Sequence, residues 1–297
     1  MKKLFWLLAV VFATPVFAQE EVDTETAFDG VYDGVVDGIV AKQHIKNKRN
    51  MVPAYVREAN VLWSKTIWCI IDLREKQNLY LYYPINTTGA ALDGRRSLVR
   101  TLLDAINDGE LKAYSSNAEN EFEQIISPRE AFDKFKAEPV DSVETVNPET
   151  GEREMKYVYD MTALPLDYVK KFMVKEVWFF DNKYTMLKSR ILGLCPIMVR
   201  PNDDGTRLDQ SLLFWVYYPA AAPFLSKQEA FTFSNDAQRP SLYDRLEARQ
   251  FGSYVYKESN VYNNRIITSY AKGMSSNIEA ERIENSVFQK EHDMWEY

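Results

Sequence analysis

Residues 63–84 read WSKTIWCIIDLREKQNLYLYYP. They contain two apolar runs, 67–71 and 79–83, with the charged residues 72–76 between them. Isoleucine, tryptophan and tyrosine are typical of strands, and a short polar interruption is typical of a turn. The stretch therefore predicts two antiparallel strands joined by a polar turn.

Helical and strand patterns alternate after this stretch. Leucines at helical spacing predict a helix over residues 95–106, and Ser127-Pro128 opens a second short helix with proline in its first turn. Residues 138–160 predict a hairpin, because Pro148 and Gly151 suit its turn. Its strands are polar, so we expect it to project outward.

The second half of the chain repeats this alternation. Strands are predicted at 175–181, 186–195 and 212–218, with a turn at Asn202-Asp203-Asp204-Gly205. Ser226 is placed as the N-cap of a following helix, with Glu229 three residues on.

The C-terminal part completes the pattern. A helix is predicted over 241–249, a strand over 254–256, a turn at Asn263-Asn264 and an amphipathic helix over 278–295. Ser275 and Ser276 are capping candidates for the last helix, which is expected to bury one apolar face: Ile278, Ile283, Val287 and Phe288.

This order of elements predicts an α+β fold, with antiparallel or mixed sheets and packed helices. Tyr82-Tyr83-Pro84 is echoed by Tyr217-Tyr218-Pro219, each after a tryptophan-containing strand. The echo suggests two weakly related sheet-and-helix halves, 63–137 and 161–297, joined by the hairpin at 138–160. The expected domain is 63–297.

The first 18 residues are typical of a signal peptide, with Lys2 and Lys3 before an apolar run that ends in Val16-Phe17-Ala18. Cleavage is expected between Ala18 and Gln19. The alternative is a membrane anchor, but residues 4–17 fall short of the roughly 20 apolar residues that span a bilayer. Gln19 stands where a lipoprotein has its acylated cysteine, so we expect membrane association through partners alone.

Residues 19–62 carry Asp-Gly at Asp29, Asp33 and Asp37. These glycines disfavour an isolated helix, and we interpret the region as an arm that becomes ordered on a partner. A calcium site is the alternative, but EF-hand acids lie two residues apart rather than four.

Charge and composition narrow the function. The formal charge of −7 becomes −9 once residues 1–18 are removed, which argues against nucleic acid as a ligand. The two cysteines, Cys69 and Cys195, are compatible with a disulfide in an exported protein and equally with two buried thiols. Sequence spacing leaves both readings open.

Catalytic motifs are scarce. The chain has only two histidines, His44 and His292, and no nucleophile elbow, P-loop or zinc-binding spacing. We therefore expect no enzyme activity, no cofactor and no metal. A periplasmic glycan-binding or glycan-hydrolysing protein is the alternative, since paired carboxylates need only spatial proximity and 43 acidic residues are available.

Aromatic residues make up 13% of the chain, and tyrosine and tryptophan are favoured at protein interfaces. This composition, in an exported chain with no anchor and no catalytic motif, indicates an assembly subunit. The candidate interface residues are Tyr82, Tyr83, Trp215, Tyr217, Tyr218 and Trp295.

Several long motifs resemble the GldN/PorN family of the gliding-motility and type IX secretion machinery, over residues 52–297. They are WSKTIW at 63–68, IDLREK at 71–76, LYYP at 81–84, LFWVYYP at 213–219, NDAQR at 235–239, YKESN at 256–260 and EHDMWEY at 291–297.

The resemblance implies a periplasmic protein of Bacteroidota, peripheral to the inner face of the outer membrane. It implies binding to a GldK/PorK-like outer-membrane lipoprotein, self-association with it in a ring, and contact with a GldM/PorM-like motor subunit. The family has no known catalytic residues, so none carry over to this chain.

Overall fold

A computed structural model describes residues 49–85, 95–117, 120–146, 153–201, 208–233, 235 and 237–294, all within one unit, His44–Tyr297. The signal peptide, residues 19–48 of the predicted arm, the predicted turn at 202–205 and Trp295 lie outside the described residues. The rest of the predicted arm, residues 49–62, is described, and its last two residues belong to the strand that begins at Val61.

The fold is α+β, as predicted. Its main sheet is antiparallel and has eight strands in the order β10-β1-β6-β7-β9-β2-β3, with β8 also pairing with β7. The strands are β1 (Val61–Asp72), β2 (Ala113–Ser115), β3 (Ile125–Ile126), β6 (Val169–Asp181), β7 (Met186–Pro201), β8 (Leu208–Leu212), β9 (Phe214–Tyr217) and β10 (Tyr254–Glu258).

Strands from the two expected halves alternate within this sheet. β1, from the first half, lies between β10 and β6, both from the second half. The halves therefore share one sheet rather than forming two. The tyrosine-proline echo is not structural either, since Tyr82 ends a helix whereas its counterpart Tyr217 ends the strand β9.

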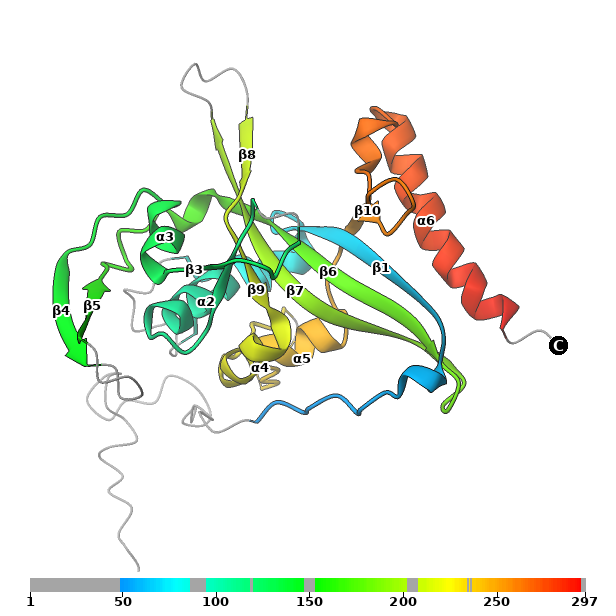
Figure 1. Ribbon diagram of the computed structural model, residues 1–297, viewed down its shortest axis with the longest axis horizontal. Helices are drawn as coiled ribbons and strands as arrows, with labels where there is room; N and C mark the ends of the chain where they lie inside the picture. Colours follow the sequence, from blue (N-terminus) through cyan, green and yellow to red (C-terminus); the bar gives the residue numbers. More distant parts are fainter. Residues whose placement is uncertain are drawn as a thin grey trace, which may run out of the picture. The chain divides into compact units, whose positions relative to one another are not determined.

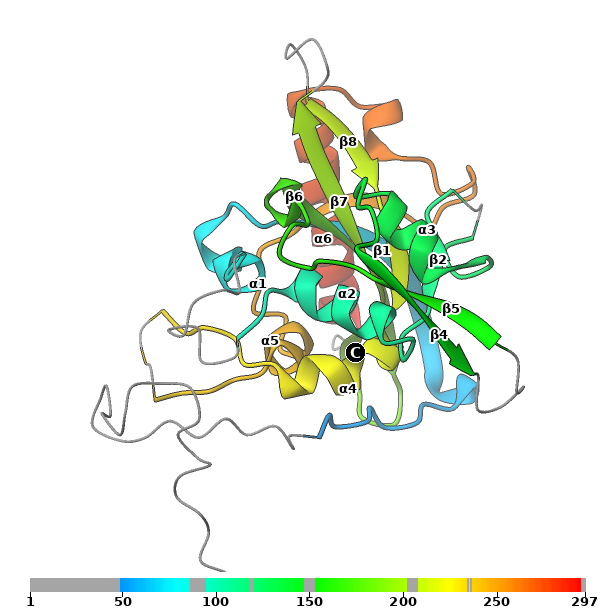
Figure 2. The same cartoon turned by 90° about the vertical axis from the view of Figure 1, so that its left-hand side faces the viewer.

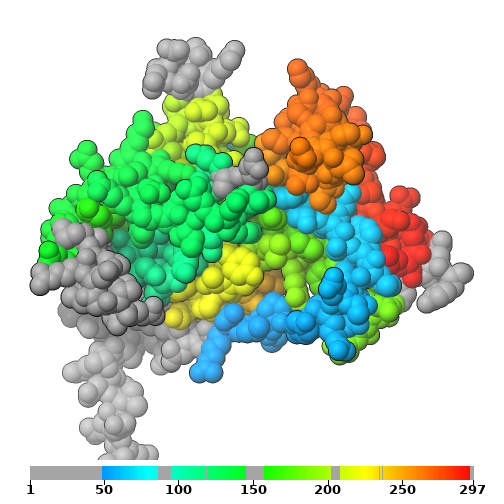
Figure 3. All heavy atoms as spheres, viewed as in Figure 1, coloured from blue at the N-terminus to red at the C-terminus, as the bar shows by residue number. Residues whose placement is uncertain are grey.

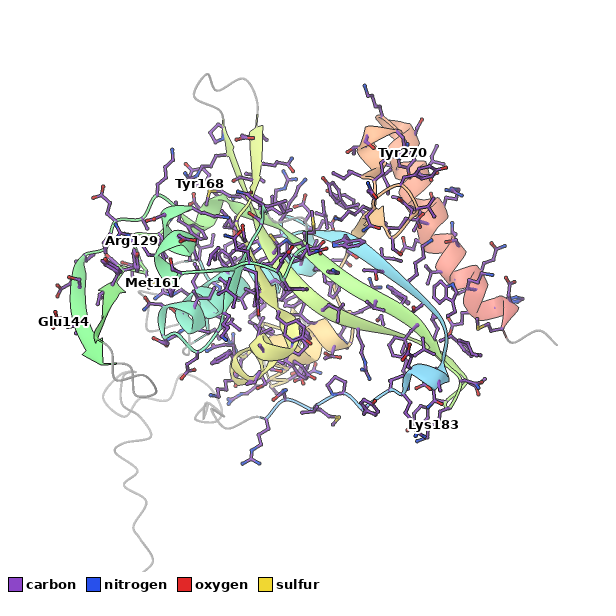
Figure 4. The ribbon with its side chains drawn as sticks, viewed as in Figure 1. Arg129, Glu144, Met161, Tyr168, Lys183 and Tyr270 are labelled. Atoms are coloured by element: carbon purple, nitrogen blue, oxygen red, sulfur yellow. The ribbon has the colours of Figure 1, made fainter. Side chains whose placement is uncertain are left out.

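The polar hairpin at 138–160 is confirmed. β4 (Asp141–Val146) pairs with β5 (Arg153–Val158) in a separate two-stranded sheet, and Val143 and Val158 are exposed. Arg129 on the neighbouring helix donates to the Tyr157 hydroxyl at 3.1 Å and so ties the hairpin to the body (Figure 4).

Three of the predicted helices are confirmed, each with a serine cap. Ser97 caps α2 (Leu98–Asn107), Ser127 caps α3 (Pro128–Asp133), and Ser241 forms a capping box with Asp244 in α5 (Leu242–Glu247). The other helices are α1 (Leu79–Tyr82), α4 (Tyr218–Lys227) and α6 (Met274–Asp293), and the short 3₁₀ turns are η2 (Glu58–Asn60), η3 (Lys76–Asn78), η5 (Leu166–Tyr168) and η6 (Ile267–Ser269).

The second strand predicted in the opening stretch is wrong. Residues 79–82 form the helix α1, because buried Asn78 turns the chain back at the end of β1. The Asn78 amide donates to the carbonyl oxygens of Asp72 and Gly252 at 2.8 and 2.9 Å. The turn buries Tyr80 and Leu81 side by side, which an alternating strand would not do.

The prediction of a helix that begins after Ser226 is also wrong. α4 precedes this residue, beginning at Tyr218 with Pro219 in its first turn, where proline is tolerated. The Ser226 hydroxyl donates to the Pro223 carbonyl oxygen at 2.9 Å, in the last turn of the helix.

The last helix, α6, differs from the prediction in where it begins and in which residues it buries. α6 begins after Gly273, so Ser275 and Ser276 lie inside its first turn rather than at a cap. Its buried residues are Ala280, Ile283 and Val287, whereas Ile278 and Phe288 are 60% and 70% exposed. The helix contacts β10 and η6, which cover a narrower stripe than the sequence pattern suggests.

Both faces of the sheet carry apolar clusters. On one face the main core lies under α2, α4 and α5, and a smaller cluster with Ile67 and Cys69 lies under α6. Figure 1 shows these two helix groups at different ends of the sheet, and Figure 2 shows α2, α4 and α5 in front of α6. The other face carries Trp68, Cys195 and Trp215.

The pairing of β1 and β7 with β6 shows where the two cysteines lie. Cys69 lies opposite Val174, and Cys195 lies opposite Met173, so the two thiols point to opposite faces of the sheet. Both are buried and free, and no disulfide joins them.

Candidate interaction surfaces

The five predicted interface residues that the structure describes differ in exposure. Tyr83 and Tyr217 are 54% and 40% exposed and remain candidates. Trp215 and Tyr218 are each 3% exposed, so their prediction as surface residues is wrong. Trp215 lies on the interior strand β9, between β7 and β2, and Tyr218 stacks on Tyr243 with ring centroids 6.2 Å apart.

Tyr82 is half-buried and fixed by polar contacts. Its hydroxyl donates to the Asp167 carbonyl oxygen at 3.0 Å and accepts from Lys170 Nζ at 2.7 Å. Its ring also packs edge-on against Tyr83, with centroids 4.9 Å apart. This support orders the exposed ring of Tyr83 and reduces the rotamer entropy that binding would cost.

A closed charge network lies on the Trp68 face. Glu121 accepts from Trp68 Nε1 at 2.7 Å and from Lys175 Nζ at 2.8 Å, and Lys257 Nζ is 3.6 Å away. Burial alone would raise the pKa of Glu121, but the hydrogen bond and charge of Lys175 hold it below its usual value. These mutual contacts indicate a structural role for the network.

Gly193 lets the neighbouring loop lie close to this face. A Cβ at Gly193 would be 2.5 Å from Cζ of Phe122. Phe122 in turn packs edge-on against Trp215 and Tyr217. The glycine therefore permits the contact that orders Tyr217 at the surface.

A cavity of ≈240 Å³ lies between the sheet and α6. Its sheet side includes Cys69 and Trp178, its helix side includes Val287 and Phe288, and Arg249 lines it from the segment between α5 and β10. The cavity is the space that the narrow contact stripe of α6 leaves unfilled.

A buried ion pair lies beside this cavity. Glu176 is 0% exposed, and its two carboxylate oxygens accept from Arg249 Nη2 at 2.9 Å and Nε at 3.2 Å. Trp178 Nε1 donates to the same carboxylate at 3.1 Å. Burial raises the pKa of Glu176, and the Arg249 charge opposes that rise.

The chemistry available here is limited. Burial raises the pKa of the Cys69 thiol to about 12, so it stays protonated and is a poor nucleophile. Across the residues that the structure describes, no group of three or more histidine, cysteine or acidic side chains could hold a metal ion.

A projecting segment that the sequence analysis did not single out runs from Ser259 to Gly273. Val261 and Tyr262 are 89% and 67% exposed at its tip, and the Arg265 guanidinium lies over the rings of Tyr262 and Tyr270, at 5.2 and 4.2 Å. Figure 3 shows the segment in orange, standing out from the surface, and Figure 4 places Tyr270 on it beside α6.

Asparagines hold this segment in shape. Asn260 Oδ1 accepts from the backbone amides of Tyr262 and Arg265, and Asn264 Oδ1 accepts from the amide of Asn260. Asn263 and Asn264 both have positive φ angles, 55° and 53°, which asparagine tolerates better than most residues. The predicted Asn263-Asn264 turn was the available sequence signal for this surface.

A second surface lies at the start of the described chain. Residues 50–57 are extended and have no regular secondary structure. Tyr243 donates from its hydroxyl to the Met51 carbonyl oxygen at 2.5 Å, and Arg190 donates to that of Ala54. A cavity of ≈270 Å³ separates this segment from β7, α4 and α5.

The comparison with protein families decides the identity. The model of the family described as "Gliding motility associated protein GldN" matches residues 56–296, which include every strand and helix described above. The chain belongs to the GldN family. No protein with a curated description matches the chain.

Membership makes the chain a component of the gliding-motility and type IX secretion machinery. GldN is a family of structural components rather than a known family of enzymes. No helix in the described part of the chain has both the length and the apolar character to cross a membrane. Neither the family nor the described residues support the glycan alternative.

Proposed function

We propose that this GldN-family chain is an exported, non-enzymatic ring subunit beneath the outer membrane. It binds a GldK/PorK-like lipoprotein, associates with further copies of itself and contacts a GldM/PorM-like motor subunit. The observation that carries the proposal is the family match over residues 56–296.

The surfaces of the described residues support an assembly role. Tyrosine and arginine dominate binding energy in many interfaces, and the Ser259–Gly273 segment presents both in an ordered stack. Tyr83 and Tyr217 add exposed aromatic rings that neighbouring side chains hold in place. We assign the Ser259–Gly273 segment to the lipoprotein contact.

Envelope fractionation tests the proposal. The protein should sediment with outer membranes in wild-type cells, and it should become soluble or be degraded in a strain that lacks the lipoprotein, because its buried interface is lost. Retention at the membrane in that strain would contradict the proposal.

A variant pair then tests the assigned surface. Tyr262→Ser with Arg265→Ser removes the exposed stack, and we expect it to reduce co-sedimentation without changing the fold. Tyr184→Ser is the matched control, because Tyr184 is also exposed and also packs on a cation, Lys188. Equal co-sedimentation of the two variants would show that the lipoprotein contact lies elsewhere on the protein.

The N-terminal regions complete the proposal. Export removes residues 1–18, and residues 19–57 form the arm that becomes ordered on a partner, since η2 and β1 begin at Glu58 and Val61. The intact mass of the mature protein should begin at Gln19, with no acyl chain attached. An acylated or uncleaved N-terminus would show that the chain carries its own membrane anchor.

A further inference from the structure

The segment 50–57 is held by its backbone alone in the contacts described above. Both hydrogen bonds from the body, from Tyr243 and Arg190, end on carbonyl oxygens. Its large side chains are exposed, with Met51 and Tyr55 at 81% and 89%, and Val52 at 78% although it borders the cavity beneath the segment. Carbonyl recognition of this kind fixes a chain path without using the apolar side chains that the segment carries.

The groove beneath the segment is only partly filled. Its walls come from Leu192 on β7, Ala222 on α4, and Tyr243 and Glu247 on α5, while Val52 and Pro53 lie across it. A volume of ≈270 Å³ remains between the walls and the segment.

The groove also contains an open sheet edge. Between Met186 and Leu192, β7 pairs with β6 on one side, while its pairing with β9 begins at Gly193 and with β8 at Ile197. No described strand pairs with the other side of this stretch. Pro53 has no amide hydrogen, so the segment follows the edge without completing a ladder.

A short joint connects the segment to the sheet. Arg57 is extended, η2 spans Glu58–Asn60, and the register of β1 against β6 is irregular between Val61 and Trp63. A change in the backbone angles of this joint would redirect the whole segment while leaving β1 in place.

We infer that the segment 50–57 is exchanged between neighbouring copies of this chain, so that the segment of one copy occupies the β7–α4–α5 groove of the next. The inference rests on the self-association proposed above. Exchange preserves the same carbonyl contacts, and it places a second body where it can cover Met51, Val52 and Tyr55.

Exchange links copies of the chain to one another. The segment and the groove are different surfaces, so copies can exchange segments reciprocally in a two-fold dimer or pass them head-to-tail in a closed ring or an open filament. The head-to-tail form is the one that the proposed ring requires. A second copy of this chain is therefore the occupant that agrees with the proposed assembly.

Thiol cross-linking in the envelope tests the exchange. Cells would carry two versions of the protein with tags of different size, one with Val52→Cys and the other with Glu247→Cys, since both positions line the groove. A short bis-maleimide then joins thiols that lie close together. Cys69 and Cys195 are buried in the folded protein and should react little.

Exchange predicts a cross-linked dimer that contains both tags, at a yield about tenfold or more above the control, because docking raises the local thiol concentration. The control replaces Val52→Cys by Val143→Cys, an exposed position on the β4–β5 hairpin. Leu192→Cys serves as a second acceptor, in case Glu247→Cys disturbs α5.

A single chain with both Val52→Cys and Glu247→Cys separates the other outcomes. Closure within the chain, with no mixed dimer in envelopes where the protein still sediments as an assembly, overturns the exchange and leaves the proposed function standing. Cross-linking to a different protein also overturns it, because the groove then belongs to a partner. Loss of assembly in all strains, including the control, overturns both proposals.

Discussion

The helices α2 and α6 lie on the same face of the sheet but are held very differently. α2 has ten residues and buries seven of them, whereas α6 has twenty residues and buries three. Leu102 and Leu103 in α2 are 0% exposed, while Phe288 in α6 is 70% exposed. α2 is therefore part of the core, and α6 is attached to its margin.

The difference follows from what each helix covers. α2 lies over the main core with α4, α5 and the centre of the sheet. α6 lies over the smaller cluster near β10 and η6 and leaves a cavity beside Trp178. A helix with little buried surface can move or bind a partner at small cost to the fold.

A core truncation gives the largest expected effect. Leu102→Ala should lower the free energy of unfolding by about 4 kcal/mol, because it leaves a cavity in a fully buried site. Val287→Ala in α6 should cost only about 1–2 kcal/mol, since fewer buried methyl groups are lost. Urea denaturation measures both, and equal losses would show that α6 belongs to the core.

Breaking the ion pair beside the α6 cavity should give the next largest loss of stability. Arg249→Met leaves the buried Glu176 carboxylate without its cation and should cost about 3 kcal/mol at neutral pH. Glu176→Gln should cost less, because the Arg249 side chain is 30% exposed and water can still solvate it.

The pH dependence of this effect has a definite sign. Burial raises the pKa of Glu176 above its unfolded value of 4.5, so the folded state binds the extra proton and stability falls as pH rises through the raised pKa. Arg249→Met removes the opposing charge and should strengthen this fall. Urea denaturation of this variant across acid to neutral pH measures it, and adding Glu176→Gln should abolish it.

Hydrogen exchange tests the comparison without any substitution. Amides of α6 should exchange through local opening, at least about tenfold faster than those of α2 once intrinsic rates are corrected. Mass spectrometry of the peptides from 98–107 and 274–293 measures the difference. Equal protection would mean that the two helices open together.

The smallest effects are expected on the outer side of α6. Ile278→Ser and Phe288→Ser should each change the free energy of unfolding by no more than about 0.5 kcal/mol, because both side chains are exposed. Ile283→Ser is the matched control and should be clearly destabilising, since Ile283 is buried. Thermal unfolding would expose a hidden contact if Phe288→Ser matched that control.

Local chemistry made several elements predictable. Proline beside Ser127 and beside Ser241 marked two helix starts, and turn residues marked the hairpin of β4 and β5. The prediction of a strand over residues 79–83 is wrong because an alternating leucine-tyrosine run fits a strand and a helical turn equally well. Asn78 decided the outcome through its contact with Gly252, far along the chain.

The candidate surfaces were less predictable. Tyr217 and Tyr218 are neighbours in sequence, yet the first is 40% exposed and the second is 3% exposed. The chain passes from β9 to α4 between them, and only packing against α5 determines which ring is covered. Tyr262 and Arg265 gave no sequence pattern of their own beyond the turn at Asn263-Asn264.

The sequence by itself determined the fold class, the GldN resemblance and the elements whose caps, turns and apolar periods lie within a few residues of one another. Only the tertiary structure decided that Cys69 and Cys195 face opposite ways, that Glu176 is buried with Arg249, and that α6 uses a narrow stripe. The physical reason is range. Caps and turns act between neighbours in the chain, whereas burial and pairing depend on strands and helices that the sheet brings together from distant segments.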